Sequence, residues 1–149
     1  MRTLYAWLTL CGVIIGFASC KKEAKPQIPI AITGKWYVQQ YTLTSLVNGT
    51  SSTSTATPTG WFTDSDYYQL NANGSGIESH ADPSIGKQAF TFQVLNSNVF
   101  LSRPLTLLGK DTCSYSMPSS NQLILKTGYT ETSTTGNVYK VTQEVDLSK

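Results

Sequence analysis

Apolar and polar residues alternate with a period of two along much of the chain. Phe90, Phe92 and Val94 alternate with Thr91 and Gln93. Residues 138–147 alternate in the same way. One side of the segment has the apolar residues Tyr139, Val141, Val145 and Leu147, and the other side has the polar residues Lys140, Thr142, Glu144 and Asp146. This period is typical of a β-strand that buries one face and exposes the other.

The same pattern predicts eight or nine strands and no long helix, because no extended stretch has apolar residues at helical spacing. The predicted strands are residues 36–47, 61–70, 77–80, 90–94, 99–101, 112–117, 122–126, 129–132 and 138–147. The pairs Asn48-Gly49, Asn73-Gly74 and Asn96-Ser97 are typical of tight turns. Antiparallel strands with one apolar face must close or pair to avoid bare edges, so we expect an all-β, antiparallel up-and-down barrel of eight or nine strands.

A different pattern stands at the start of the chain. Arg2 precedes an almost wholly apolar run over residues 4–17, and these fourteen residues are fewer than the roughly 20 that a membrane-spanning helix needs. The run therefore predicts a signal peptide. It ends in Ala18-Ser19-Cys20, which resembles the lipobox of bacterial lipoproteins. The resemblance implies a diacylglyceryl group on the Cys20 thiol, cleavage before Cys20 and acylation of the new amino terminus. The alternative is a soluble secreted protein in which Cys20 has no such role.

This interpretation divides the chain into a signal peptide (1–19), a tether (20–32) and a barrel domain (33–149). The 130 residues from Cys20 onward suit one domain with a real core. Two or more fatty chains anchor a protein stably, whereas one does not. We therefore expect a monomer held to a membrane of the bacterial cell envelope, and specifically the outer membrane, by its lipid.

Charge and cysteine content exclude several classes of protein. Without Arg2 the chain has ten basic and nine acidic residues, so its charge does not suggest a nucleic-acid partner. Cys11 leaves with the signal peptide and Cys20 is lipidated, which leaves Cys113 alone and no intrachain disulfide.

Candidate chemistry is sparse. Glu78, His80 and Asp82 are spaced by two, so a strand would project them from one face, as a metal site or a proton relay requires. Since Ile77 lies on the alternate face, we interpret the three as a solvated outer surface. Asp64-Ser65-Asp66 lacks the glycine and glutamate of a known calcium loop, and Cys113 has no histidine nearby in sequence. We expect no metal, no cofactor and no enzyme activity.

Four segments together resemble the lipocalins and the lipocalin-like lipoproteins of the Bacteroidetes group: "ITGKWYVQQYTL", "YYQLNANGSG", "FTFQVLNSNVFL" and "NQLILKTG". The first contains a Gly-x-Trp on the first strand, Gly34-Lys35-Trp36. The resemblance covers residues 31 to 147 and implies that Gly34 and Trp36 close one end of the barrel, with Trp36 under a basic side chain from the last strand. That strand offers Lys140 and Lys149 and no arginine. The alternative is an ordinary core tryptophan.

The segment "NGTSSTSTATPTG", residues 48–60, is longer than a hairpin needs. By the resemblance it would be a lid over the barrel mouth, with Trp61 beside it. A flexible Ser/Thr surface loop is the equal alternative.

Two functions follow from these expectations. An eight-stranded barrel has room for one small ligand, so the first hypothesis is a binding module for an apolar or amphipathic molecule. Its candidate lining residues are Tyr41, Trp61, Tyr68, Phe90, Phe92, Val94 and Tyr139. The second is a non-enzymatic structural or interaction protein of the envelope, accessory to surface glycan handling, with a filled core. Large inward side chains favour the second hypothesis and small ones the first.

Overall fold

The computed structural model describes residues 28–57 and 62–149, which form nine strands and one short 3-10 helix, η1 (Ile30–Ile32). The strands are β1 (Gly34–Val47), β2 (Thr50–Ala56), β3 (Tyr67–Leu70), β4 (Ser75–Ser79), β5 (Lys87–Leu95), β6 (Asn98–Leu101), β7 (Thr112–Ser119), β8 (Gln122–Thr132) and β9 (Val138–Ser148). In these two ranges no helix is both long and apolar enough to cross a membrane. The predicted signal peptide, Cys20 and Trp61 lie outside the described residues.

Eight of the strands close into an antiparallel barrel, which confirms the fold predicted from the sequence. From β1 the neighbours are β3, β4, β5, β6, β7, β8 and β9 in order, and β9 pairs again with β1. Every pairing is antiparallel and follows chain order apart from β2, so the barrel is of the up-and-down kind that lipocalins have. Within the described chain, β2 pairs with β1 alone and stands outside the ring.

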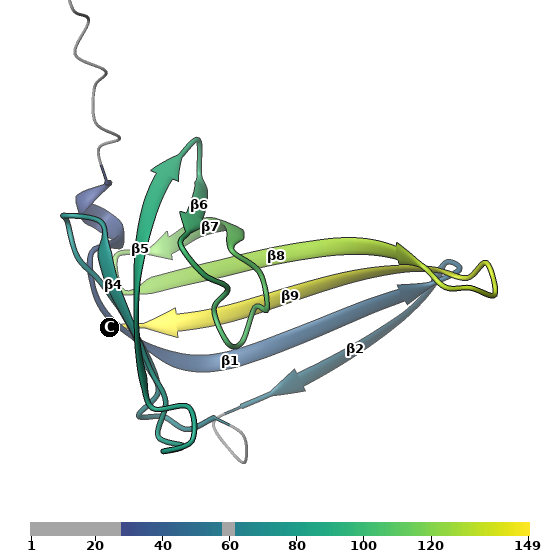
Figure 1. Cartoon of the computed structure of the whole chain (residues 1–149), viewed down its shortest axis with the longest axis horizontal. Helices are drawn as coiled ribbons and strands as arrows, with labels where there is room; N and C mark the ends of the chain where they lie inside the picture. Colours follow the sequence, from purple (N-terminus) through teal and green to yellow (C-terminus); the bar gives the residue numbers. More distant parts are fainter. Residues whose placement is uncertain (1–27, 58–61) are drawn as a thin grey trace, which may run out of the picture.

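The first strand belongs to two parts of the molecule. Residues 34–37 of β1 pair with β3, and residues 41–47 pair with β2. The register against β9 shifts between Val38 and Gln40, which marks a β-bulge, and bulges bend the strand that carries them. Beyond the bulge, β1 leaves the barrel together with β2, β8 and β9, and Figure 1 shows these strands projecting far to one side. We call this part the extension: residues 41–47, 50–56, 128–132 and 138–142.

For residues 48–56, the expectation of a lid or of an irregular loop is wrong, because residues 50–56 form β2. Residues 58–60 lie outside the described residues. The turn before β2 has positive φ at both central residues, 46° at Asn48 and 90° at Gly49, as a two-residue type I′ turn requires. This turn brings the Thr/Ser run directly alongside β1, and threonine favours strands. The prediction of an Asn-Gly turn here is therefore confirmed, and it is the reason that the lid does not form.

Other strand boundaries also differ from the prediction. The expected strands 122–126 and 129–132 are one strand, β8, because Gly128 pairs with Thr142 and does not interrupt the ladder. The strand expected over residues 61–70 begins only at Tyr67. Since β8 and β9 stay paired over eleven residues, they give the extension its length.

The alternation in β5 is confirmed. Phe90, Phe92 and Val94 are buried in the core, whereas Thr91 and Gln93 are exposed. The ring of Phe90 lies across Gly76 on the neighbouring strand, where a Cβ atom would overlap it. Large aromatic side chains therefore reach well into the barrel.

Candidate functional site

The candidate lining residues do not form one group. Five of them belong to the buried core: Tyr41, Tyr68, Phe90, Phe92 and Val94. Tyr41 is buried where β1 leaves the barrel, and its hydroxyl accepts a hydrogen bond from Gln143 Nε2 at 3.2 Å. Tyr139 is half-buried on the extension, opposite Val47 near the distal turn, and so stands apart from the other candidates. Trp61 lies outside the described residues.

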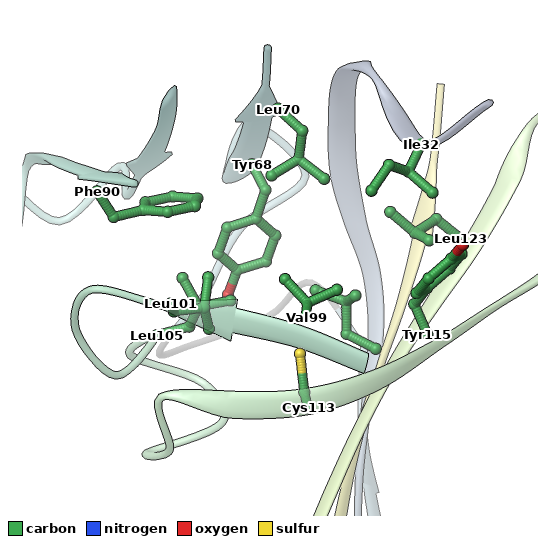
Figure 2. Close-up of a pocket in the computed structure, with 11 residues that line it drawn as sticks. Ile32, Tyr68, Leu70, Phe90, Val99, Leu101, Leu105, Cys113, Tyr115 and Leu123 are labelled. Atoms are coloured by element: carbon green, nitrogen blue, oxygen red, sulfur yellow. The ribbon is translucent and has the colours of Figure 1, made fainter. Parts of the chain in front are cut away.

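The barrel interior is filled. Figure 2 shows side chains from most of the strands meeting there, and the cavity that they leave has a volume of about 10 Å³. A single water molecule needs roughly 10–15 Å³ of such space. Its lining consists of Ile32, Tyr68, Leu70, Phe90, Val99, Leu101, Leu105, Cys113, Tyr115, Leu123 and Leu125. The interior therefore has no room for a fatty acid or a sterol in this conformation.

Trp36, the tryptophan of the Gly-x-Trp segment, belongs to the buried core and lies near the start of β1. Its side chain is fully buried, and its indole Nε1 donates a hydrogen bond to the Ile32 carbonyl in η1 at 2.7 Å. The ammonium of Lys149, directly after β9, lies 4.4 Å from the centre of the indole ring, a cation–π distance. Gly34 has a φ of 130°, and a side chain there would press against Lys149. The basic residue beside Trp36 is thus Lys149, whereas Lys140 lies on the extension.

The segment between β6 and β7 packs against the core of the barrel. We call residues 102–111 the covering loop. It follows the first half of β5, where no described strand pairs with β5 on that side. Ser102 exchanges two hydrogen bonds with the Thr91 backbone, and Arg103 Nε donates to the Ala89 carbonyl. The loop therefore takes the place of a strand beside the first half of β5.

Three leucines of the covering loop enter the core. Leu105, Leu107 and Leu108 are 2%, 3% and 0% exposed, and Leu105 lines the small cavity. The sequence carried a signal for this feature, because three leucines within four residues are unusual in a solvent-exposed loop. The leucines occupy space that an internal ligand would otherwise fill.

A cluster of charged side chains is buried beside this loop. His80 Nδ1 lies 2.9 Å from Asp66 Oδ2, and His80 Nε2 lies 3.1 Å from Glu78 Oε1. Arg103 Nη2 donates to Glu78 Oε2 at 2.6 Å. We call Asp66, Glu78, His80 and Arg103 the ionic cluster. The side chains of its first three members are 2% exposed or less, and that of Arg103 is 25% exposed.

The predicted solvated surface is therefore wrong for Glu78 and His80, which are buried, and right for Asp82. Gly76, Glu78 and His80 lie on the inward face of β4 and its continuation, and Ile77 points outward. Asp82 is exposed and makes its hydrogen bonds to Ser84 instead. The reason is that hydrogen bonds and opposite charges compensate the cost of burying Glu78, and neither compensation can be read from the spacing alone.

The ionic cluster ties three loops together through backbone groups. Glu78 Oε1 accepts a hydrogen bond from the Thr106 amide in the covering loop at 2.7 Å. Asp66 Oδ1 accepts from the Ala81 amide at 2.8 Å and from the Thr63 hydroxyl at 2.9 Å. The two carboxylates thus fix the loops that carry residues 62–66, 80–86 and 102–111 against the barrel.

The same contacts leave the cluster little chemistry to perform. Both ring nitrogens of His80 face carboxylate oxygens, so neither is free to act as a base towards a substrate. The Arg103 guanidinium directly compensates the charge of Glu78, which favours burial of that carboxylate. Among residues 28–57 and 62–149, no three histidine, cysteine or acidic side chains are placed to hold a metal ion.

Two further polar groups border the interior. Burial, and after it the charge of the Glu78 carboxylate, raises the pKa of Tyr68 well above its usual value, so the phenol stays neutral. Its buried hydroxyl has no hydrogen-bond partner among the described residues. Burial also raises the pKa of Cys113 to about 12, which keeps it a thiol at neutral pH and so a poor nucleophile.

No family model, curated protein or solved structure matches the chain.

Sequence reasoning missed two features of this site. The first is Asp66 and Arg103 as the partners of the buried Glu78 and His80, and the second is the covering loop with its leucines. The hydrogen bonds and ion pairs of the ionic cluster hold the covering loop against the barrel.

Proposed function

We propose that the protein is a lipid-anchored component of the bacterial cell envelope, related to the lipocalin-like lipoproteins, and that its filled barrel acts through its surface. The observation that carries this proposal is the interior cavity of about 10 Å³. Pockets that bind small molecules usually enclose roughly 300–1,000 Å³. A barrel filled by its own leucines and aromatic side chains is a rigid support for a binding surface.

Two further observations support the proposal. Leu95 and Phe100, on the hairpin of β5 and β6, are 59% and 44% exposed, and such side chains are common at protein contacts. The Lys149 ammonium over Trp36 also matches the arrangement that the lipocalin resemblance implies for the barrel end. Lipid anchoring itself is supported by the sequence, through the apolar run that ends at Ala18-Ser19-Cys20.

A ligand titration tests the filled interior. Fatty acids, sterols and hydrophobic dyes are titrated into the protein, and we expect no saturable binding at micromolar concentration. The matched positive control is Leu108→Ala, which removes a fully buried side chain and opens an apolar cavity of the kind that binds small hydrophobic molecules. Stoichiometric binding of a lipid by the unaltered protein would sink the proposal.

Anchoring is tested separately with Cys20→Ser. Incorporation of labelled fatty acid and partition into membranes should both be lost in this variant. Unchanged labelling would exclude Cys20 as the lipidation site, whatever the titration shows.

The second candidate function is the binding of an apolar or amphipathic ligand inside the barrel, and one observation favours it. The Tyr68 hydroxyl is buried and unpartnered at the small cavity, where it could bind the polar end of a ligand. Such a ligand would have to displace the covering loop. Binding that becomes tighter when Glu78→Gln loosens this loop would favour the second candidate over the first.

A further inference from the structure

The extension ends on one side in a strand that is open along its whole length. Within the described chain, β2 pairs with β1 alone, and Figure 1 shows it at the margin of the sheet. All of its residues from Thr50 to Thr55 are exposed. An open strand presents a row of unpaired amides and carbonyls that another extended chain can pair with.

The turn geometry indicates which backbone groups are free. A two-residue type I′ turn joins a hydrogen-bonded pair, here Val47 and Thr50. Hydrogen-bonded and non-hydrogen-bonded pairs alternate along an antiparallel ladder. The amides and carbonyls of Ser51, Thr53 and Thr55 therefore point away from β1, towards the open side.

Natural proteins protect such strands with charges, prolines, bulges or covering loops. The β2 sequence TSSTSTA contains no charge and no proline, and its pairing with β1 continues without a bulge from residue 50 to 56. The other open strand of the extension differs. Residues 128–132 of β8 include the charged Glu131, and Lys110 lies over the ring of Tyr129 at 4.7 Å. Only the β2 side of the extension is therefore left without a charged side chain.

We propose that β2 pairs with β2 of a second copy of this chain, antiparallel and centred on Thr53, to form a two-fold symmetric dimer. A pairing centred on Thr53 sets Ser52 opposite Ser54 and Ser51 opposite Thr55, so hydroxyl side chains face hydroxyl side chains over residues 51–55. Cross-strand threonine pairs stabilise sheets, and Thr53 already makes one with Thr44 inside the chain, with 3.4 Å between the two hydroxyl oxygens.

The symmetry of this contact favours the second copy as the partner. An antiparallel strand pair centred on one residue is self-complementary, so the contact closes at two molecules. It joins two four-stranded extensions into one continuous eight-stranded sheet. Pairing of β2 with β8 of another copy would instead be head-to-tail and would generate growing chains. The inference goes beyond the proposed function, because it holds whether or not Cys20 carries lipid, and it departs from the monomer expected from the sequence.

The test uses charge at the two-fold axis. The full chain, extracted in mild detergent, is examined by sedimentation velocity over a concentration series. Thr53→Lys and Thr53→Asp each place like charges opposite one another in the dimer, and each should raise the dimer dissociation constant about tenfold or more. An equimolar mixture of the two variants should recover dimers, because lysine then faces aspartate. Thr132→Lys on β8, where the residue is exposed and lies opposite Val138, is the matched control and should leave the dimer intact.

The contact would be established if each Thr53 variant alone is folded but dimerises weakly, and the mixture of the two variants forms dimers. The proposal is overturned if the unaltered protein stays monomeric at every concentration, since β2 would then serve another partner or none. It is overturned equally if Thr132→Lys abolishes assembly, if species larger than the dimer grow with concentration, or if the mixture fails to dimerise.

Discussion

The buried carboxylate of Glu78 should be one of the most sensitive positions in the domain, and Glu78→Gln tests this. The side chain is fully buried and accepts hydrogen bonds from Arg103 Nη2 and from the Thr106 amide, with His80 Nε2 also in contact. Glutamine has nearly the same shape but no charge, and its amide nitrogen is a donor. One of the three contacts would then set a donor against a donor.

The loss in free energy of unfolding depends on the charges that stay buried after the substitution. Removing one partner of a buried ion pair costs roughly 3–5 kcal/mol, because the other charge stays buried without compensation. The Arg103 side chain is 25% exposed, so water recovers part of its loss. We therefore expect a cost of about 3 kcal/mol, out of roughly 5–15 kcal/mol for a typical domain.

Urea denaturation followed by the fluorescence of the buried Trp36 measures this cost. With an m-value of about 1.5 kcal/mol/M, the midpoint should fall by about 2 M while m stays constant. Asp82→Asn is the control, because this carboxylate is exposed and belongs to no buried pair, and its midpoint should be unchanged. Amide hydrogen exchange at Thr106 should also accelerate in Glu78→Gln. A midpoint as high as that of Asp82→Asn would refute the view that the ionic cluster clamps the covering loop.

Three shorter predictions concern other parts of the fold. Trp36→Ala should cost roughly 3–5 kcal/mol in urea denaturation, since it removes a fully buried ring from the core, whereas Tyr139→Ala on the half-buried extension should cost much less. Gly76→Ala should cost roughly 1–3 kcal/mol by overpacking against the Phe90 ring, and a thermal melt equal to that of the unaltered protein would contradict this. Burial, and after it the charge of Glu144, raises the pKa of Asp146 from 3.8, so the unfolded chain ionises first as the pH rises and stability falls between the ordinary and the raised values. Asp146→Asn should therefore melt higher than the unaltered protein at about pH 7 and no higher at about pH 3, and an equal gain at both would count against it.

The barrel could be predicted from the sequence because period-two patterning reports directly on burial. In β5, the alternation of Phe90, Phe92 and Val94 with polar residues identified the inward face correctly. Turn chemistry was equally direct, since Asn48-Gly49 adopts the positive φ values that the residue pair suggests. Both signals are local, and both depend on residues within a few positions of one another.

The strand β2 was missed because its composition carries no burial signal. A run of serine and threonine is exposed on both faces here, so its pairing depends on the backbone and on the turn before it rather than on apolar contacts.

The inward face of β4 was assigned wrongly because its burial pattern misleads. Its inward positions are Gly76, Glu78 and His80, and Ile77 is the outward residue, so the hydrophobic pattern is inverted. The compensating partners Asp66 and Arg103 lie 12 and 25 residues from Glu78, beyond the reach of any local pattern.

The second of these failures, the inverted face of β4, has its structural cause in the covering loop. A barrel in which a loop replaces a strand beside β5 leaves inward backbone groups that no ladder can satisfy, and buried amides must find acceptors. Glu78 supplies such an acceptor to Thr106, Arg103 compensates the charge of Glu78, and His80 links Glu78 to Asp66. The ionic cluster therefore makes the polar contacts that hold the covering loop, and the three buried leucines of the loop make its apolar contacts. Together they close the barrel, and what remains available to other molecules is its outer surface and the open strand of the extension.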